Sequence, residues 1–194
     1  SDLFYYCFYI VGMKMSFSKL TKKDSMEMLA HYIGMIDAGC SDYAEVKLTY
    51  EKACKELKAK FTHTDKIIEY TNDMLAASLA FLYELGMKQG SAHVSNILEN
   101  YDAVIREKEL KGSPDYVEAY NNLQKIVALI PAELRSLYDD YLEYLSFMET
   151  FIPKLAHYYG FIIGNEVHME EKSDYELPNK YKGWLSDYLN MKLE

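Results

Sequence analysis

The chain has 194 residues, of which 49% are hydrophobic and 26% charged, with only 9 glycines and 4 prolines. This balance excludes an intrinsically disordered or a collagen-like chain, and the length predicts one domain with a sizeable core. The net charge of −9 argues against nucleic acid as the main partner, because phosphate binding needs a basic surface. One local exception is a basic segment, which is either solvated or in contact with a phosphate or an acidic partner: Lys14, Lys19, Lys22 and Lys23.

The cysteines and the hydropathy pattern predict a cytoplasmic protein without a transmembrane helix. Cys7, Cys40 and Cys54 are an odd number and include no CxxC pair, so neither a disulfide framework nor a thiolate zinc site is indicated. The sequence starts without the basic leader of a signal peptide. The longest near-apolar run, over residues 3–13, is well short of the about 20 residues that cross a bilayer.

An apolar arm over residues 1–13 is the first predicted element, and a single helical domain over residues 14–194 follows it. Residues 3–13 contain five aromatic side chains and no charge, which together offer on the order of 1000 Å² of surface. We expect this arm to dock on its own domain, to pair with a second chain or to meet a membrane surface, and its residue types also allow an extended strand. If the natural protein begins at Met13, the preceding twelve residues are extra. The candidate interaction residues are Phe4, Tyr5, Tyr6, Phe8 and Tyr9.

Two helices are predicted next, over residues 24–38 and 41–60. Asp24 or Ser25 is a suitable N-cap for the first, and Gly39 ends it. Ser41 caps the second, whose apolar residues recur at alternating spacings of three and four opposite a charged face. This second pattern is typical of a surface helix with one buried side.

The helical signal from residue 64 to residue 110 is too long for one helix of a compact domain. Such a helix would be about 69 Å long, whereas a compact chain of this length has a diameter of about 42 Å. We therefore predict a break at Gly86–Ser91. Residues 76–82 are apolar on nearly every side, which predicts that the helix over residues 64–85 is the central helix of a bundle.

Prolines mark the remaining helix boundaries. Ser113 is predicted as an N-cap with Pro114 at the first helical position, and Pro131 opens the next helix, which Pro153 kinks or ends. The fold class is therefore all-α, a single-domain bundle of about six to seven helices. The predicted helices of this part of the chain cover residues 114–130, 131–152, 154–171 and 181–193.

A glycine spacing predicts where two helices cross closely, and the predicted helix breaks indicate where a pocket lies. Gly160 and Gly164 are four residues apart, a small-residue spacing that lets two helices cross closely. The predicted breaks, at Gly86–Ser91 and near Pro153, interrupt the two longest helical segments. We expect a pocket beside one of these breaks.

The carboxylates of Asp139, Asp140 and Glu143 form an acidic motif. Such a set can hold Mg²⁺ against a diphosphate, and over five residues the motif resembles one found in the all-helical isoprenoid synthases. A second metal motif is lacking, since Asn72-Asp73 is not followed by further acidic residues at the next turns. Because the three carboxylates lie opposite the apolar stripe of their helix, we predict a solvated face.

A metal site is suggested by three residues in the last quarter of the chain: His157, His168 and Glu171. They share one side of a helix if residues 157–171 form one unbroken helix. Helical bundles build metal sites from such side chains on facing helices, although the Glu-x-x-His order of di-metal sites is absent. The alternative interpretation is that these histidines lie at the surface or form single hydrogen bonds, and no cofactor is predicted.

Tyrosine is unusually frequent, with 19 residues. Many tyrosines lie at the edges of apolar stripes, where they either pack at the boundary of the core or form a contact surface. Nucleotide-binding and nucleophile motifs are absent. The leading hypothesis is a non-catalytic interaction or regulatory protein that forms a homodimer or binds a protein partner. The alternatives are a helical metal-dependent enzyme or metal-binding protein, and a small-ligand receptor with a tyrosine-lined pocket.

Overall fold

The computed structural model describes residues 20–40, 42–91 and 113–169. These residues are almost entirely helical and include no strand, which confirms the all-α prediction. The part of the predicted helical signal beyond residue 91 and the predicted helix over residues 181–193 lie outside the described ranges, so the total number of helices stays a prediction. The elements are α2 (Lys22–Gly39), α3 (Tyr43–Lys60), α4 (Thr64–Ser91), α6 (Pro114–Val127), the short 3-10 helix η2 (Ala132–Leu134) and α7 (Arg135–Met169).

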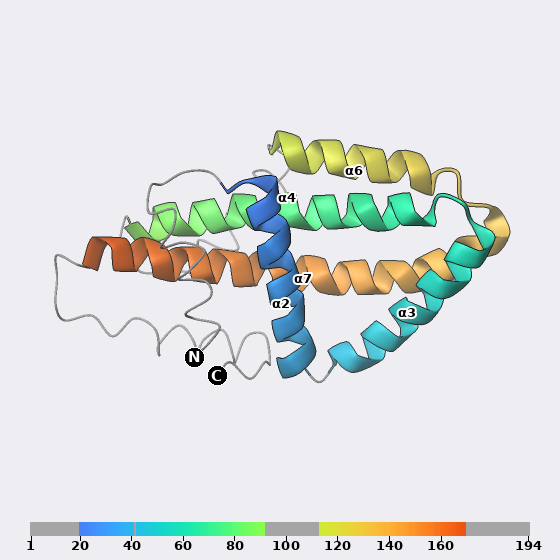
Figure 1. The fold of residues 1–194 in the computed structure, drawn as a ribbon, viewed down its shortest axis with the longest axis horizontal. Helices are drawn as coiled ribbons and strands as arrows, with labels where there is room; N and C mark the ends of the chain where they lie inside the picture. The colour runs from blue at the N-terminus through green and yellow to red at the C-terminus, as the bar shows by residue number, and fades with distance from the viewer. Residues whose placement is uncertain (1–19, 41, 92–112, 170–194) are drawn as a thin grey trace.

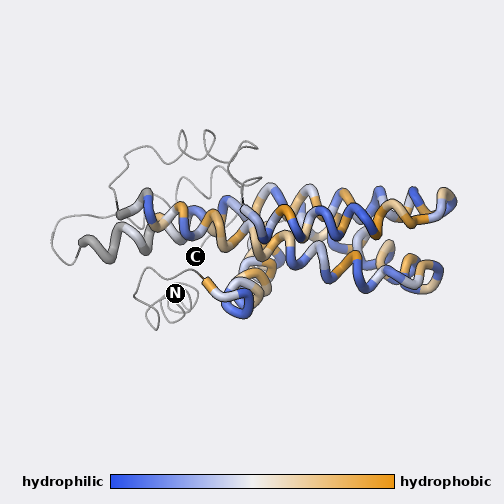
Figure 2. The backbone as a smooth tube through the Cα atoms, turned by 90° about the horizontal axis from the view of Figure 1, so that it is seen from above, coloured by the Kyte–Doolittle hydropathy of each residue, from blue (hydrophilic) through white to orange (hydrophobic). Residues whose placement is uncertain are grey.

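Two long helices, α4 and α7, run side by side through the middle of the described structure (Figure 1). α6 lies along α4, α2 crosses the pair, and α3 packs against α7. α4 contacts each of α2, α3, α6 and α7, and α7 contacts each of α2, α3 and α4. That the helix over residues 64–85 is the central one stays a prediction. Apolar residues recur along every helix (Figure 2), and side chains from all five helices meet in one buried core.

A capping box fixes the start of α2. The side-chain oxygen of Thr21 accepts a hydrogen bond from the amide of Asp24 at 3.1 Å, and the Asp24 carboxylate accepts one from the amide of Thr21 at 3.2 Å. The predicted cap at Asp24 or Ser25 is therefore wrong. Asp24 supports the cap from the third helical position, where its charge also suits the positive end of the helix dipole. At the start of α3 the N-cap is Asp42, and the predicted cap Ser41 lies outside the described residues.

α7 continues through Pro153 as one helix of 35 residues, so the predicted helix end at this proline is wrong. The pyrrolidine ring removes one donor and leaves the carbonyl of Glu149 without its helical partner. Glu149 is exposed, whereas Ile152, Leu155 and Ala156 on the adjoining turns are buried. Water can therefore replace the lost bond while apolar packing holds the helix. α7 is about 52 Å long, which is more than the diameter of about 42 Å expected for a compact chain of this length.

α4 does not break at Gly86 or Gly90, contrary to the prediction, and its described part ends at Ser91. A glycine inside a helix costs only about 1 kcal/mol relative to alanine. Burial of Gly86 against α7 offsets a cost of this size.

Glycines allow the backbones of α4 and α7 to touch where the two helices cross. A Cβ atom at Gly86 of α4, or at Gly160 or Gly164 of α7, would overlap a carbonyl oxygen of the facing helix. Only glycine fits such an approach, so the close crossing predicted from Gly160 and Gly164 is confirmed. The carbonyl oxygens concerned are those of His157, Tyr83 and Met87, respectively.

Tyrosine rings join α3, α4 and α7 in the core. Tyr50 of α3 stacks on Tyr144 of α7 with ring centroids 3.7 Å apart, and its centroid lies 5.5 Å from that of Tyr141. The buried Tyr141 hydroxyl donates a hydrogen bond to Oγ1 of Thr71 on α4 at 2.6 Å. Burial raises the pKa of the Tyr50, Tyr141 and Tyr144 phenols well above the ordinary value. These tyrosines are therefore neutral packing groups at physiological pH.

Replacing Tyr141 by phenylalanine is expected to lower the free energy of unfolding by about 1 kcal/mol. The ring stays in place and the buried hydrogen bond to Thr71 is lost, while Thr71 keeps its own bond to the carbonyl of Ile67 at 2.7 Å. Urea denaturation measures the difference, with Tyr120→Phe as the matched control because Tyr120 is exposed on α6. A loss no larger than that of the control contradicts the expectation.

Candidate functional site

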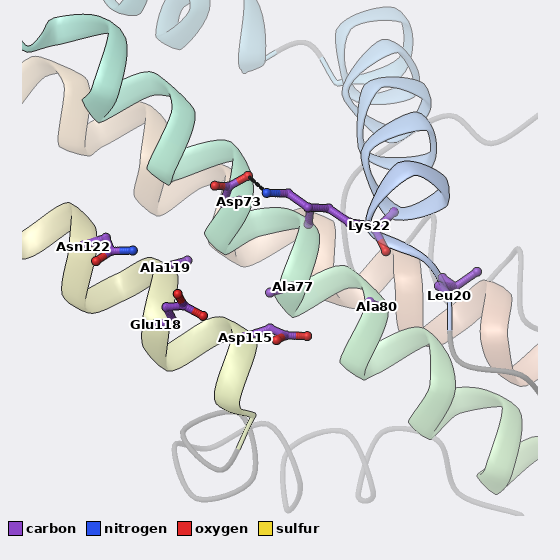
Figure 3. Close-up of a pocket in the computed structure, with 11 residues that line it drawn as sticks. Leu20, Lys22, Asp73, Ala77, Ala80, Asp115, Glu118, Ala119 and Asn122 are labelled. Carbon is purple, nitrogen blue, oxygen red and sulfur yellow. Dashed lines mark ion pairs between the residues drawn. The ribbon is translucent and has the colours of Figure 1, made fainter.

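A hollow lies at the junction of α2, α4 and α6 and is called the acidic cleft below. Its volume is about 310 Å³, at the lower end of the range for pockets that bind small molecules. Alanines form the floor of the cleft, and charged or amide side chains form its rim (Figure 3). The floor consists of Ala76, Ala77, Ala80 and Ala119, and the rim includes Lys22, Asp73, Asp115, Glu118 and Asn122.

Helical spacing brings these residues onto two facing sides. Asp73, Ala77 and Ala80 are four and three residues apart, so they follow one face of α4. Asp115, Glu118 and the remaining lining residues of α6 repeat the same spacing on the side of α6 that faces α4 (Figure 3). Because alanine has so little volume, this contact between helices leaves a space that larger side chains would fill.

Three carboxylates and one lysine among its described residues give the cleft a negative charge. Nζ of Lys22 lies 3.1 Å from a carboxylate oxygen of Asp73, and the two side chains are 75% and 22% exposed. Such a solvated pair contributes at most about 1 kcal/mol. Glu118 is exposed and forms no ion pair with any residue that the structure describes.

Two lysines of the predicted basic segment occupy the first turn of α2, next to the cleft. This is the end of a helix where the dipole disfavours positive charge, by about 0.3–1 kcal/mol for each cation. Lys22 gains Asp73 as its partner. Lys23 is exposed and has no ion pair within the described ranges, and Asp24 brings a negative charge to the same turn.

The acidic motif on α7 faces water. Asp139, Asp140 and Glu143 are all exposed, whereas Tyr138 and Tyr141 between them are buried. This is the solvated face predicted from the apolar stripe. Among the residues whose side chains the structure describes, no three His, Cys, Asp or Glu side chains are grouped so as to hold a metal ion.

The predicted histidine site falls only partly on described residues. His157 is 1% exposed, and burial lowers its pKa to about 4, so the imidazole is neutral at physiological pH. α7 is unbroken between His157 and His168, but eleven helical residues separate their Cα atoms by about 16 Å. The two histidines alone therefore do not reach one ion. The side chain of His168 and the whole of Glu171 lie outside the description, and the metal set stays a prediction.

The arm over residues 1–13 also lies outside the described residues. This includes its candidate interaction residues Phe4, Tyr5, Tyr6, Phe8 and Tyr9. Their role, like the boundary between arm and domain, stays a prediction from the sequence.

Sequence reasoning does not find the acidic cleft. It predicts a pocket beside a helix break and a lining of tyrosines, but the cleft lies between three helices and no tyrosine is among its described lining residues. One signal was available, since the two turns after Asp73 carry Ala76, Ala77 and Ala80 in place of bulky residues. That this face meets Asp115 and the other rim residues of α6 depends on helix packing, which spacing along the chain does not give.

In the part of the chain that the structure describes, no helix combines the length and the apolar character needed to cross a membrane. The acidic cleft is a feature of these residues that can receive another molecule. Comparison with models of known protein families, with characterised proteins and with solved structures gave no match.

Proposed function

We propose that this chain is a non-catalytic protein-interaction module that self-associates. The acidic cleft is the observation that carries the proposal, because an alanine floor inside a charged rim matches the apolar centre and polar rim of a protein contact surface. The sequence of the arm supports it too. Its five aromatic residues supply apolar surface whose burial favours association.

The cleft and the arm have complementary parts in this proposal. Specific interfaces bury about 1,200–2,000 Å² in total, and a hollow of about 310 Å³ accepts only a few side chains. The arm adds on the order of 1000 Å² of aromatic surface per chain, which brings the total into that range. The charged rim of the cleft then sets the orientation of the partner, since electrostatic complementarity acts mainly on specificity and on association rate.

Sedimentation equilibrium of the full chain tests this function. We expect reversible dimers, and removal of residues 1–12 is expected to weaken their association by about tenfold or more. Circular dichroism of the truncated chain controls for loss of helix. If the full chain is a monomer at all concentrations and the truncation leaves its stability unchanged, the proposal is wrong.

The volume of the cleft favours a second candidate function, a receptor for a small cationic ligand. A volume of about 310 Å³ fits a compact ligand, and the carboxylates of the rim select positive charge. Thermal-shift measurements with di- and polyamines, set against sodium chloride of equal ionic strength, test this candidate. A rise in Tm with the amines alone supports it, and equal effects of amine and salt contradict it.

A further inference from the structure

We infer that the acidic cleft binds a linear diamine, with its two ammonium groups held on opposite walls and its methylene chain on the alanine floor. The inference rests on the second candidate function above and names the ligand class of that site. It requires carboxylates on two walls, an apolar surface between them and a position where an ammonium group is accepted. The described residues of the cleft supply all three.

The carboxylates of the cleft lie on two different helices. Asp73 belongs to α4, whereas Asp115 and Glu118, three residues apart, belong to α6. Figure 3 shows Asp73 on one side of the hollow and the two α6 carboxylates on the other. Glu118 is exposed and has no ion pair with a described residue, so its charge is available to a ligand. A ligand with one cation pairs with one wall, whereas a diamine pairs with both.

The floor between the two acidic walls is apolar. Ala77 and Ala80 are partly buried, and Ala76 and Ala119 are buried, so the floor presents methyl groups and no hydrogen-bonding side chain. A methylene chain gains from burial against such a surface, while charged ends stay at the wet rim. The volume of about 310 Å³ is at the lower end for small-molecule pockets, which favours a short linear ligand.

The ion pair of Lys22 with Asp73 shows that this rim accepts an ammonium group. Nζ of Lys22 lies 3.1 Å from Oδ1 of Asp73, and the lysine side chain is 75% exposed. Because a carboxylate accepts several hydrogen bonds, a ligand ammonium group can join Lys22 at Asp73 or replace it. In both cases the charge of Lys22 opposes that of the ligand, so Lys22 is expected to lower the affinity.

Calorimetric titration of the full chain with putrescine tests the inference, with butylamine as a probe that has the same number of carbons and only one ammonium group. Putrescine is expected to bind at least about tenfold more tightly than butylamine. Glu118→Gln is expected to weaken putrescine binding about tenfold, and Lys22→Met is expected to strengthen it about threefold. Ala77→Leu is expected to abolish binding, because the larger side chain fills the hollow while every charge stays in place.

Each variant has a matched control outside the cleft. Glu143→Gln, Lys23→Met and Ala44→Leu make the same chemical changes at exposed residues that are not among the described lining residues. Their affinities for putrescine are expected to stay within about twofold of that of the natural chain. Circular dichroism checks that Ala77→Leu keeps its helices, and if it does not, Glu118→Gln and Lys22→Met decide the test.

The outcomes separate this inference from the function on which it rests. If butylamine binds as tightly as putrescine and Glu118→Gln weakens both, the cleft is a receptor for a single cation, so the diamine inference is wrong and the second candidate function stands. If the cleft variants match their controls, or if neither amine binds up to about 10 mM, both are wrong. Sedimentation equilibrium measures self-association separately, so its result does not decide this one.

Discussion

Replacing Gly160 by alanine is expected to lower the free energy of unfolding by about 3 kcal/mol, whereas the same change at Gly34 raises it by about 0.5–1 kcal/mol. A Cβ atom at Gly160 would lie 2.9 Å from the carbonyl carbon of Tyr83 and would overlap its oxygen. Because these are backbone atoms of a facing helix, no side-chain rotation relieves the clash, and α4 and α7 must move apart. At Gly34, inside α2, an added Cβ meets nothing within 4 Å, and alanine is the better helix former.

Urea denaturation of the two variants and the natural chain measures this contrast. Gly34→Ala is the matched control, since it makes the same chemical change inside a helix without a close neighbour. The double variant Gly86→Ala/Gly160→Ala is expected to lose less than the sum of its single changes, because the first substitution already separates the two helices. If Gly160→Ala is as stable as Gly34→Ala, the helices do not approach as closely as the structure indicates.

The sequence predicts most of the secondary structure because helical periodicity is a local property. The helix over residues 41–60 and the water-facing carboxylates of residues 139–143 follow from spacing alone. The N-cap at Ser113 follows from the residue types at the helix start, since Pro114 comes after it. Predictions from single breaker residues are less successful. Gly86 and Pro153 lie inside long helices because contact between α4 and α7 outweighs a glycine cost or a missing hydrogen bond, and tertiary contacts override such local preferences.

The candidate site is less predictable than the fold for the same reason. Residue 73 and the alanines after it are visible in the sequence as one helix face, and so is the face of α6 that carries Glu118. Which of these faces meet is decided by the packing of the helices around α4. The sequence instead draws attention to His157 as a metal ligand, although the structure buries it within the core of the fold. Burial of this histidine makes the stability of the fold depend on pH.

Lowering the pH from 7 to 5 is expected to cost the protein about 2 kcal/mol of stability through His157 alone. Its imidazole is buried, which lowers its pKa from the ordinary value of 6.5 to about 4. Between these two values the unfolded chain binds a proton and the folded chain does not, so acid favours unfolding. The contribution of His157 is complete above about pH 6.5 and is lost as the pH falls towards 4.

Urea denaturation at pH 7 and pH 5 of the natural chain and of His157→Gln isolates this effect. Carboxylates also contribute to the pH dependence. The quantity to compare is therefore the loss of stability from pH 7 to pH 5 in the natural chain minus the same loss in His157→Gln. It is expected to be about 2 kcal/mol. His63→Gln is the control for the substitution itself, since His63 is exposed at the start of α4. An unchanged dependence in His157→Gln would contradict a neutral, buried imidazole.

The destabilisation by Gly160→Ala and the loss of stability in acid are linked. The carbonyl of His157 faces Gly86 at the crossing of α4 and α7 that also contains Gly160. Alanine at Gly160 forces α4 and α7 apart, and the gap admits water towards the imidazole. Hydration favours the protonated form, so the folded pKa of His157 moves from about 4 back towards 6.5. We therefore expect Gly160→Ala to reduce the loss of stability between pH 7 and pH 5, while Gly34→Ala leaves that loss unchanged.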